Sequence, residues 1–210
     1  APYTSETHVH DGGIYAQDRW TIDRMTLNLG IRWDFYSTSY PAQTLGPTVY
    51  TPNRNVTFPA GDLASLRDIT PKLGLAYDLF GTGKTAVKAS LSKYVEQLTY
   101  TGTYGDSANP MQRTVQSVTR QWNDVDTDFI PDCDHTNPLL NGECLQISNL
   151  AFGNPIPSTT YNQDVLNGWG QRGYNWETSV SVQHELVPNV YMDVGYYRRW
   201  YGNFLATDNR

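Results

Sequence analysis

The sequence of 210 residues contains no apolar run that approaches the roughly 18 residues of a membrane-spanning helix. Hydrophobic residues make up 39% of the chain, and the mean hydropathy is −0.54. These values exclude a helical membrane protein. They are compatible with a protein that crosses a membrane with strands, because such strands turn only half of their residues toward lipid.

Basic clusters and catalytic motifs are also absent. The formal net charge is −6, which argues against nucleic acid as a partner. The stretch GTGKT at 81–85 imitates the end of a phosphate-binding loop, but Asp78 stands where that motif has its first glycine. The G-x-S-x-G motif of serine hydrolases does not occur either. We therefore expect no enzyme.

The chain instead contains three copies of one pattern, in which two long alternating stretches are joined by a very short turn. Between Met25 and Phe35 every second residue is apolar, and no turn signal occurs before Tyr40. A strand that runs from Met25 to Tyr40 is far longer than an ordinary strand, which has roughly five or six residues. The pattern predicts hairpins at 13–40, 69–100 and 175–204, separated by long loops at 41–68 and 101–174.

Short turns on one side and long loops on the other are typical of the β-barrels of outer membranes. We expect an all-β fold of six antiparallel strands, with the turns at 23–24, 81–84 and 188–189 together at one end and aromatic residues at the lipid interfaces. Six strands are too few to close a barrel in lipid, which takes about eight. The chain is therefore predicted to be an incomplete barrel segment that contacts outer-membrane lipid and pairs with other barrel strands or copies of itself.

The hairpin sequences resemble those of one family. GIYAQDRWTIDRMTLNLGIRWDFYS, ITPKLGLAYDLFGTGKTAVKASLSKY and VSVQHELVPNVYMDVGYYRRW are similar to successive hairpins of TonB-dependent outer-membrane receptors. The resemblance is to the large-barrel branch that carries an N-terminal carboxypeptidase-regulatory-like domain. It implies a barrel fragment without the plug, at the bacterial cell surface, in a protein whose task is transport.

The longer loop carries a dense group of carboxylates. Asp124, Asp126 and Asp128 have the spacing with which a tight loop wraps a hard cation, and Asp132 and Asp134 follow. The run resembles the acidic repeats of thrombospondin type 3 more than an EF-hand, because Phe129 replaces the EF-hand glycine. The pattern predicts bound Ca²⁺ with these five aspartates as ligands, and a solvated acidic loop is the alternative.

Two cysteines, Cys133 and Cys144, bracket the end of the acidic run, and the chain has no others. In an oxidising envelope such a pair predicts a disulfide. A zinc site with His135 as the third ligand is the alternative, although no CxxC motif supports it.

The loops are also the predicted place for recognition of an extracellular ligand. The alternative to a receptor segment is a soluble or surface-attached β-rich module that binds carbohydrate or assembles with itself. In either case loop aromatics could stack on a ligand, and the candidates are Tyr104, Trp122, Tyr161, Trp169 and Tyr174.

Overall fold

The structure is a computed structural model that describes residues 4–156 and 159–209. The chain divides into two compact units. One, called here the strand unit, comprises His10–Ser37, Ala64–Leu98 and Asn162–Arg210. The other, called the loop unit, comprises Ala1–Val9, Thr38–Leu63 and Thr99–Tyr161.

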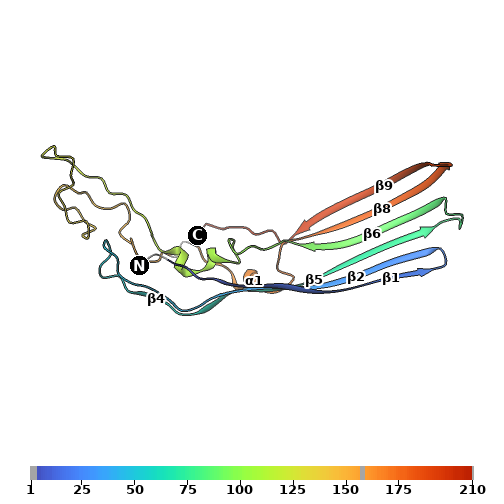
Figure 1. The fold of residues 1–210 in the computed structure, drawn as a ribbon, viewed down its shortest axis with the longest axis horizontal. Coiled ribbons are helices and arrows are strands. Elements are labelled where there is room, and N and C mark those ends of the chain that lie inside the picture. Colours follow the sequence, from blue (N-terminus) through green and yellow to red (C-terminus); the bar gives the residue numbers. More distant parts are fainter. Residues whose placement is uncertain (1–3, 157–158, 210) are drawn as a thin grey trace. The chain divides into compact units, whose positions relative to one another are not determined.

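The strand unit is built on one long sheet in the order β1-β2-β5-β6-β8-β9 (Figure 1). The β5–β6, β6–β8 and β8–β9 ladders are antiparallel, and the short turns lie together at one end of the sheet, as predicted. β1 and β9 form its two edges, so the sheet is open among the described residues. The six strands are β1 His8–Ile22, β2 Met25–Tyr40, β5 Gly61–Asp78, β6 Thr85–Val95, β8 Tyr174–Val187 and β9 Val190–Gly202.

Strand pairing sorts the side chains of this sheet onto two chemically different faces. Val182 lies opposite Val87 on one side and Val194 on the other, so apolar side chains continue from strand to strand on one face. On the other face Lys88 donates to Gln183 Oε1 at 2.6 Å, and the hydroxyls of Ser90 and Ser179 lie 2.7 Å apart. The alternation of apolar and polar residues predicted from the sequence therefore gives the sheet one apolar and one polar face.

Two glycines show that the polar face extends to β2. A Cβ atom added to Gly30 would lie 3.5 Å from Lys72 Cβ, and one added to Gly74 would lie 3.6 Å from Asn28 Cβ. Gly30 and Asn28 therefore share a face with Lys72 and Gly74. The apolar odd-numbered residues of 25–35 lie on the opposite face.

Two strands begin earlier than predicted from the sequence, whereas β6 ends at Val95 and β9 at Gly202, before the predicted hairpin ends at 100 and 204. β1 begins at His8 instead of residue 13, and β5 begins at Gly61, inside the range 41–68 that was predicted to be loop. Leu63, Ala64 and Leu66 are all buried, so side chains on both faces of β5 are covered here. This double burial hides the alternation by which the rest of the strand was recognised.

The loop unit contains short strands, short helices and a small core. A loop as long as 101–174 is expected to contain structure of this kind. A two-stranded sheet pairs β3 Gln43–Leu45 with β4 Val56–Phe58, and Met111 packs with Leu45 and Phe58 in a small core. Met111 lies in the 3-10 helix η2 Pro110–Arg113, which follows η1 Asp106–Ala108.

Asn109 ties the loop unit together from its interior. Its side chain is fully buried, and its Oδ1 accepts from the backbone N–H of Met111 at 3.0 Å to cap η2. Its Nδ2 donates to Glu6 O at 3.1 Å and to Thr7 Oγ1 at 3.2 Å. One buried amide thus joins segments that lie about a hundred residues apart in sequence.

In the strand unit the segment around 163–173 folds against β5. The short helix α1 Gln163–Leu166 leads into β7 Asn167–Trp169, which pairs in parallel with Ser65–Arg67. None of the helices in residues 4–156 and 159–209 is long and apolar enough to cross a membrane.

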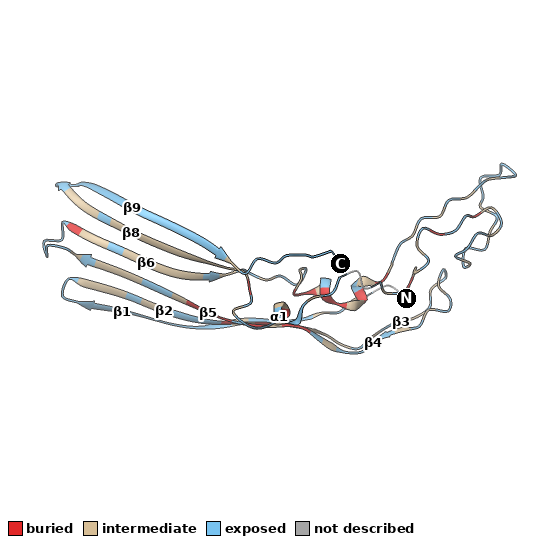
Figure 2. Ribbon diagram, turned by 180° about the vertical axis from the view of Figure 1, so that it is seen from behind, coloured by how far each residue is buried: buried red, intermediate tan, exposed pale blue. Residues whose placement is uncertain are grey.

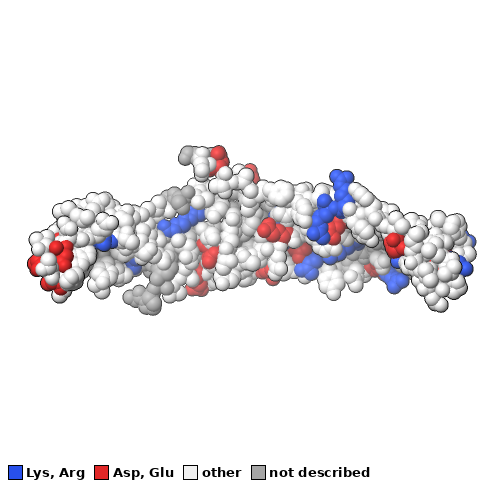
Figure 3. Space-filling model, turned by 90° about the horizontal axis from the view of Figure 1, so that it is seen from above, with Lys and Arg blue, Asp and Glu red and all other residues white. Residues whose placement is uncertain are grey.

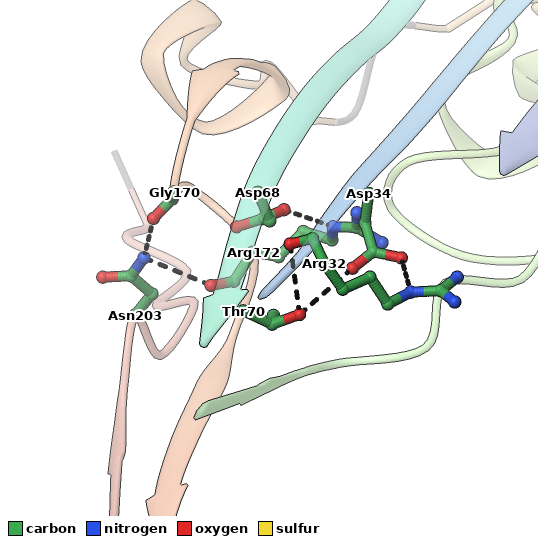
Figure 4. A network of polar contacts seen from close by, with 7 residues as sticks. All are labelled: Arg32, Asp34, Asp68, Thr70, Gly170, Arg172 and Asn203. Atoms are coloured by element: carbon green, nitrogen blue, oxygen red, sulfur yellow. Dashed lines mark hydrogen bonds and ion pairs between the residues drawn. The ribbon is translucent and has the colours of Figure 1, made fainter. Parts of the chain in front are cut away.

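A buried ion pair holds this segment in place (Figure 4). Arg172 Nε donates to Asp68 Oδ2 at 2.5 Å, and the two side chains are 5% and 1% exposed. Asn203 Nδ2 donates to the carbonyls of Gly170 and Arg172, so the end of β9 is bound to the same segment. Among the described residues, Asp68 Oδ1 and Arg172 Nη2 are buried without a hydrogen-bond partner.

We predict that Arg172→Met lowers the free energy of unfolding by about 3–5 kcal/mol, because it leaves the Asp68 carboxylate buried and uncompensated. The double variant Asp68→Leu/Arg172→Met should recover most of the loss. The measurement is a urea titration in detergent micelles, followed by tryptophan fluorescence. The matched control is Arg199→Met, which breaks the exposed ion pair of Arg199 with Glu177 and should cost under about 1 kcal/mol. Equal losses for Arg172→Met and Arg199→Met would contradict the prediction.

Candidate functional site

The acidic run forms a compact carboxylate cluster in the loop unit. Oxygens of Asp124, Asp126 and Asp128 all lie within 4.8 Å of one another. Asp124 Oδ1 is buried and has no hydrogen-bond partner among the described residues. Figure 3 shows acidic atoms gathered where this loop lies. Three carboxylates this close repel one another unless a cation or protons neutralise them.

The backbone wraps around the cluster. Thr127 and Phe129 both have a φ of 64°, a left-handed conformation that is uncommon for residues other than glycine. The N–H of Phe129 donates to Asp124 Oδ2 at 3.1 Å, and the N–H of Asp128 donates to Asp126 Oδ1 at 3.3 Å. These bonds orient the carboxylates while leaving Asp124 Oδ1 free.

Glu143 holds the backbone on both sides of the cluster. Its Oε1 accepts from the N–H of Val125 at 2.7 Å, and its Oε2 accepts from the N–H of Asp132 at 3.1 Å. No role was predicted for Glu143 from the sequence. Its position depends on the fold of the whole loop, and its place beside Cys144 was the only available signal.

The remaining two predicted ligands have different surroundings. Partial desolvation raises the pKa of Asp132, and the negative charges of Asp126, Asp128 and Glu143 raise it further. Hydrogen bonds from the side chain and backbone of Thr136 lower the pKa of Asp134. Asp132 thus lies within electrostatic reach of the cluster, whereas Asp134 is engaged in a turn of its own.

The two cysteines are joined in a disulfide, as predicted. The Cα atoms of Cys133 and Cys144 lie 5.8 Å apart, within the range that such bonds span. Both sulfurs are used in this bond, which favours the disulfide over the zinc alternative, although a ring nitrogen of His135 lies within 4.8 Å of both sulfurs. Gly142 is required in the ring: a Cβ there would lie 2.0 Å from Asp132 O.

Arg120 organises the disulfide ring, whose residues are 133–144, through backbone carbonyls. Its Nε donates to Leu145 O at 2.6 Å, Nη2 to Leu139 O at 2.6 Å and Nη1 to Asn137 O at 3.0 Å. A single guanidinium therefore binds the carbonyls of two residues within the ring and of the residue that follows it. Nothing in the sequence distinguished this arginine from the others.

The predicted ligand-binding aromatics do not form a common stack. Tyr104 is buried, and Trp169 is 55% exposed. The ring of Tyr161 lies under Arg113 with 5.4 Å to the guanidinium carbon, and that of Tyr174 lies 5.0 Å from Lys93 Nζ. Trp122 forms an isolated bridge with Cys144. The aromatic stacks observed in the described part of the chain involve other residues.

The comparisons with known proteins give one positive result. A family model described as an outer membrane beta barrel domain matches residues 1–198. No curated protein and no solved structure matches the chain.

We predict that replacing both cysteines with serine loosens the ring. By the chain-entropy relation, a closed loop of this size contributes about 3 kcal/mol. Chymotrypsin should therefore cut after Leu139 or Leu140, which lie inside the ring, on the order of a hundredfold faster if local opening limits cleavage. Cleavage sites are identified by mass spectrometry.

Reductant should accelerate cleavage of the native protein in the same way and leave the rate for the double-serine variant unchanged. Equal rates for the native and double-serine proteins would show that the bond does not restrain the ring.

Proposed function

The chain belongs to the outer membrane beta barrel domain family, and on that premise we propose that it is a wall segment of a TonB-dependent receptor. In this proposal the strand unit lies in lipid and the loop unit binds an extracellular ligand for transport. Family membership places the chain in the bacterial outer membrane. It also favours the receptor segment over the soluble module that the sequence left open.

The observation that carries the proposal is the exposed apolar face of the sheet. Val180, Val182, Val194 and Tyr196 lie on this face and are between 41% and 63% exposed. In water such a face would be a liability. In lipid it is the face that a barrel needs, while the opposite polar face lines the interior.

The loop end of the same face carries amphipathic rings. Trp176 and Trp200 lie opposite each other, with centroids 6.3 Å apart. Arg198 lies over the Trp200 ring, with its guanidinium carbon 5.6 Å from the centroid. Rings and cations at this level are typical of the boundary between hydrocarbon and water.

The finer assignment to TonB-dependent receptors is supported by the hairpins. The three stretches that resemble that family lie in consecutive order along one sheet. β1 and β9 are exposed over nearly their whole length (Figure 2). Because unpaired strand edges are not tolerated in lipid, we propose that other strands of a larger barrel cover them.

We also propose that the carboxylate cluster binds Ca²⁺. The residues fit the ion, since Asp124 Oδ1 is buried without a partner and the donors are hard oxygens. Asp124, Asp126 and Asp128 would hold the ion, with Asp132 close by. The bound charge would offset the repulsion among the acids and fix the loop from which recognition takes place.

The membrane orientation can be tested with two neighbouring substitutions on β9. Val194→Arg places a charge on the apolar face and should destabilise the inserted protein by about 2–4 kcal/mol, as expected near a bilayer midplane. Asp193→Arg places the same charge on the polar face and should be tolerated within about 1 kcal/mol. The measurement is urea-dependent folding into lipid vesicles. Equal costs for the two variants would rule out a lipid-facing apolar face.

Calcium binding can be tested by chelation. Removing Ca²⁺ with EGTA should speed proteolysis within residues 120–146 and leave the strands resistant. Asp124→Asn and Asp126→Asn should give the fast rate even with Ca²⁺ present, because a neutral amide holds the ion weakly. The control is Asp62→Asn, an exposed acid elsewhere in the loop unit, which should behave as the native protein does. Cleavage at one rate with and without EGTA would leave the run as a solvated acidic loop.

A further inference from the structure

The loop unit contains a groove that no sequence pattern predicts. Its volume is about 710 Å³, within the range of ligand sites. Its walls come from residues 50–54, from 116–120 and from 135–154. The last segment includes His135, Thr136 and Pro138 of the disulfide ring, so the ring forms part of the wall.

The charge of this groove is opposite to that of the chain. The protein has 21 acidic residues and a net charge of −6, yet no aspartate or glutamate is among the described residues that line the groove. Arg54 and Arg120 both line it, and neither forms an ion pair among the described residues. Two arginines that form no ion pair thus face one concave surface, and the charge of Arg120 also lowers the pKa of Asp134.

The two arginines differ in what they can offer a ligand. The guanidinium of Arg120 is committed to backbone carbonyls, so it contributes charge more than donors. Arg54 Nε donates to Gly46 O at 2.8 Å, and its two terminal nitrogens have no hydrogen-bond partner among the described residues. A guanidinium with free terminal N–H groups suits a carboxylate, which it can bind through two parallel bonds.

The rest of the lining combines amides with apolar surface. Asn53, Gln116 and Asn154 carry side-chain amides that can pair with peptide groups, and Phe152 and Ile147 offer apolar contact. Such a set lacks the carboxylate acceptors that would bind the hydroxyls of a neutral sugar strongly. A short peptide has all the matching groups: backbone amides, apolar side chains and acidic side chains.

We propose that this groove binds a short acidic peptide segment that also carries apolar side chains, with Arg54 as the residue that pairs with its carboxylate. This inference rests on the proposed function, in which the loop unit binds the receptor's extracellular ligand, and it names the chemical class of that ligand. The Arg54 guanidinium selects the charge, and the side-chain amides set the register of the peptide backbone.

The test uses the full chain folded in detergent and three acetylated, amidated peptides of sequence Glu-Leu-Glu-Phe, Gln-Leu-Gln-Phe and Lys-Leu-Lys-Phe, with binding measured by calorimetry. The acidic peptide should bind about tenfold or more tightly than the neutral one, as expected for charge-assisted hydrogen bonds. Binding of the lysine peptide should be the weakest. Raising the salt concentration should weaken binding of the acidic peptide, because the groove is open to solvent.

Arg54→Met should remove the preference for the acidic peptide, whereas Arg54→Lys should retain part of it because the charge remains. The control is Arg24→Met, which removes an exposed arginine from the turn between β1 and β2 and should bind as the native protein does. If Arg54→Met disturbs folding, the salt dependence and the three-peptide comparison on the native protein still decide the question.

Equal binding of the three peptides, no binding of the acidic peptide, or unchanged binding by a folded Arg54→Met would overturn the inference. Binding of maltohexaose in place of the acidic peptide would overturn it in favour of carbohydrate. These outcomes are independent of the proposed function, whose own test is vesicle insertion of the Val194 and Asp193 variants. A protein that inserts as expected but ignores the acidic peptide would refute the groove assignment alone.

Discussion

The hydrogen-bonded ladder of the long sheet is the constraint on which the rest of this structure depends. In lipid no water replaces a missing backbone bond, so the strands must stay paired across the whole hydrocarbon layer. The β6–β8 ladder runs without a break from Thr85↔His184 to Val95↔Tyr174, and β8–β9 continues it. Once pairing is fixed, the period of two sorts every side chain to lipid or to the interior. Among the described residues, the outer edges of β1 and β9 are the parts of this sheet's border strands that have no paired strand beside them.

Where the ladder changes partners, the protein uses buried polar groups instead of a larger apolar core. β5 is paired with β6 from Lys72 to Asp78 but extends back to Gly61, and β7 covers part of its remaining edge. Asp68 becomes buried there, and Arg172 supplies the opposite charge. Asn109 has a comparable role inside the loop unit. Such groups make each segment's position specific, because a shifted segment would leave a buried charge or amide without its partner.

The sequence predicted those features that depend on neighbouring residues. Alternation between Met25 and Tyr40 is a local property, so the strand and its short turns were found correctly. The disulfide could be predicted because the sequence contains only two cysteines. The start of β5, the role of Glu143 and the pairing of Arg172 were missed because each depends on a segment far away in sequence. The groove draws its lining from three such segments, and no spacing marks them in advance.

The disulfide ring explains how a strongly acidic loop can lie beside an arginine-lined groove without neutralising it. Here Arg120 is held by the carbonyls of Asn137, Leu139 and Leu145, so its donors are satisfied while it forms no ion pair with a carboxylate. The carboxylates of Asp124 and Asp126 are held by bonds to the backbone of their own loop, and of the five acids Asp134 is the one whose pKa Arg120 lowers. Neutralising the acids with a cation would then leave the positive groove as the dominant charge of this region, which favours an anionic ligand at the cell surface.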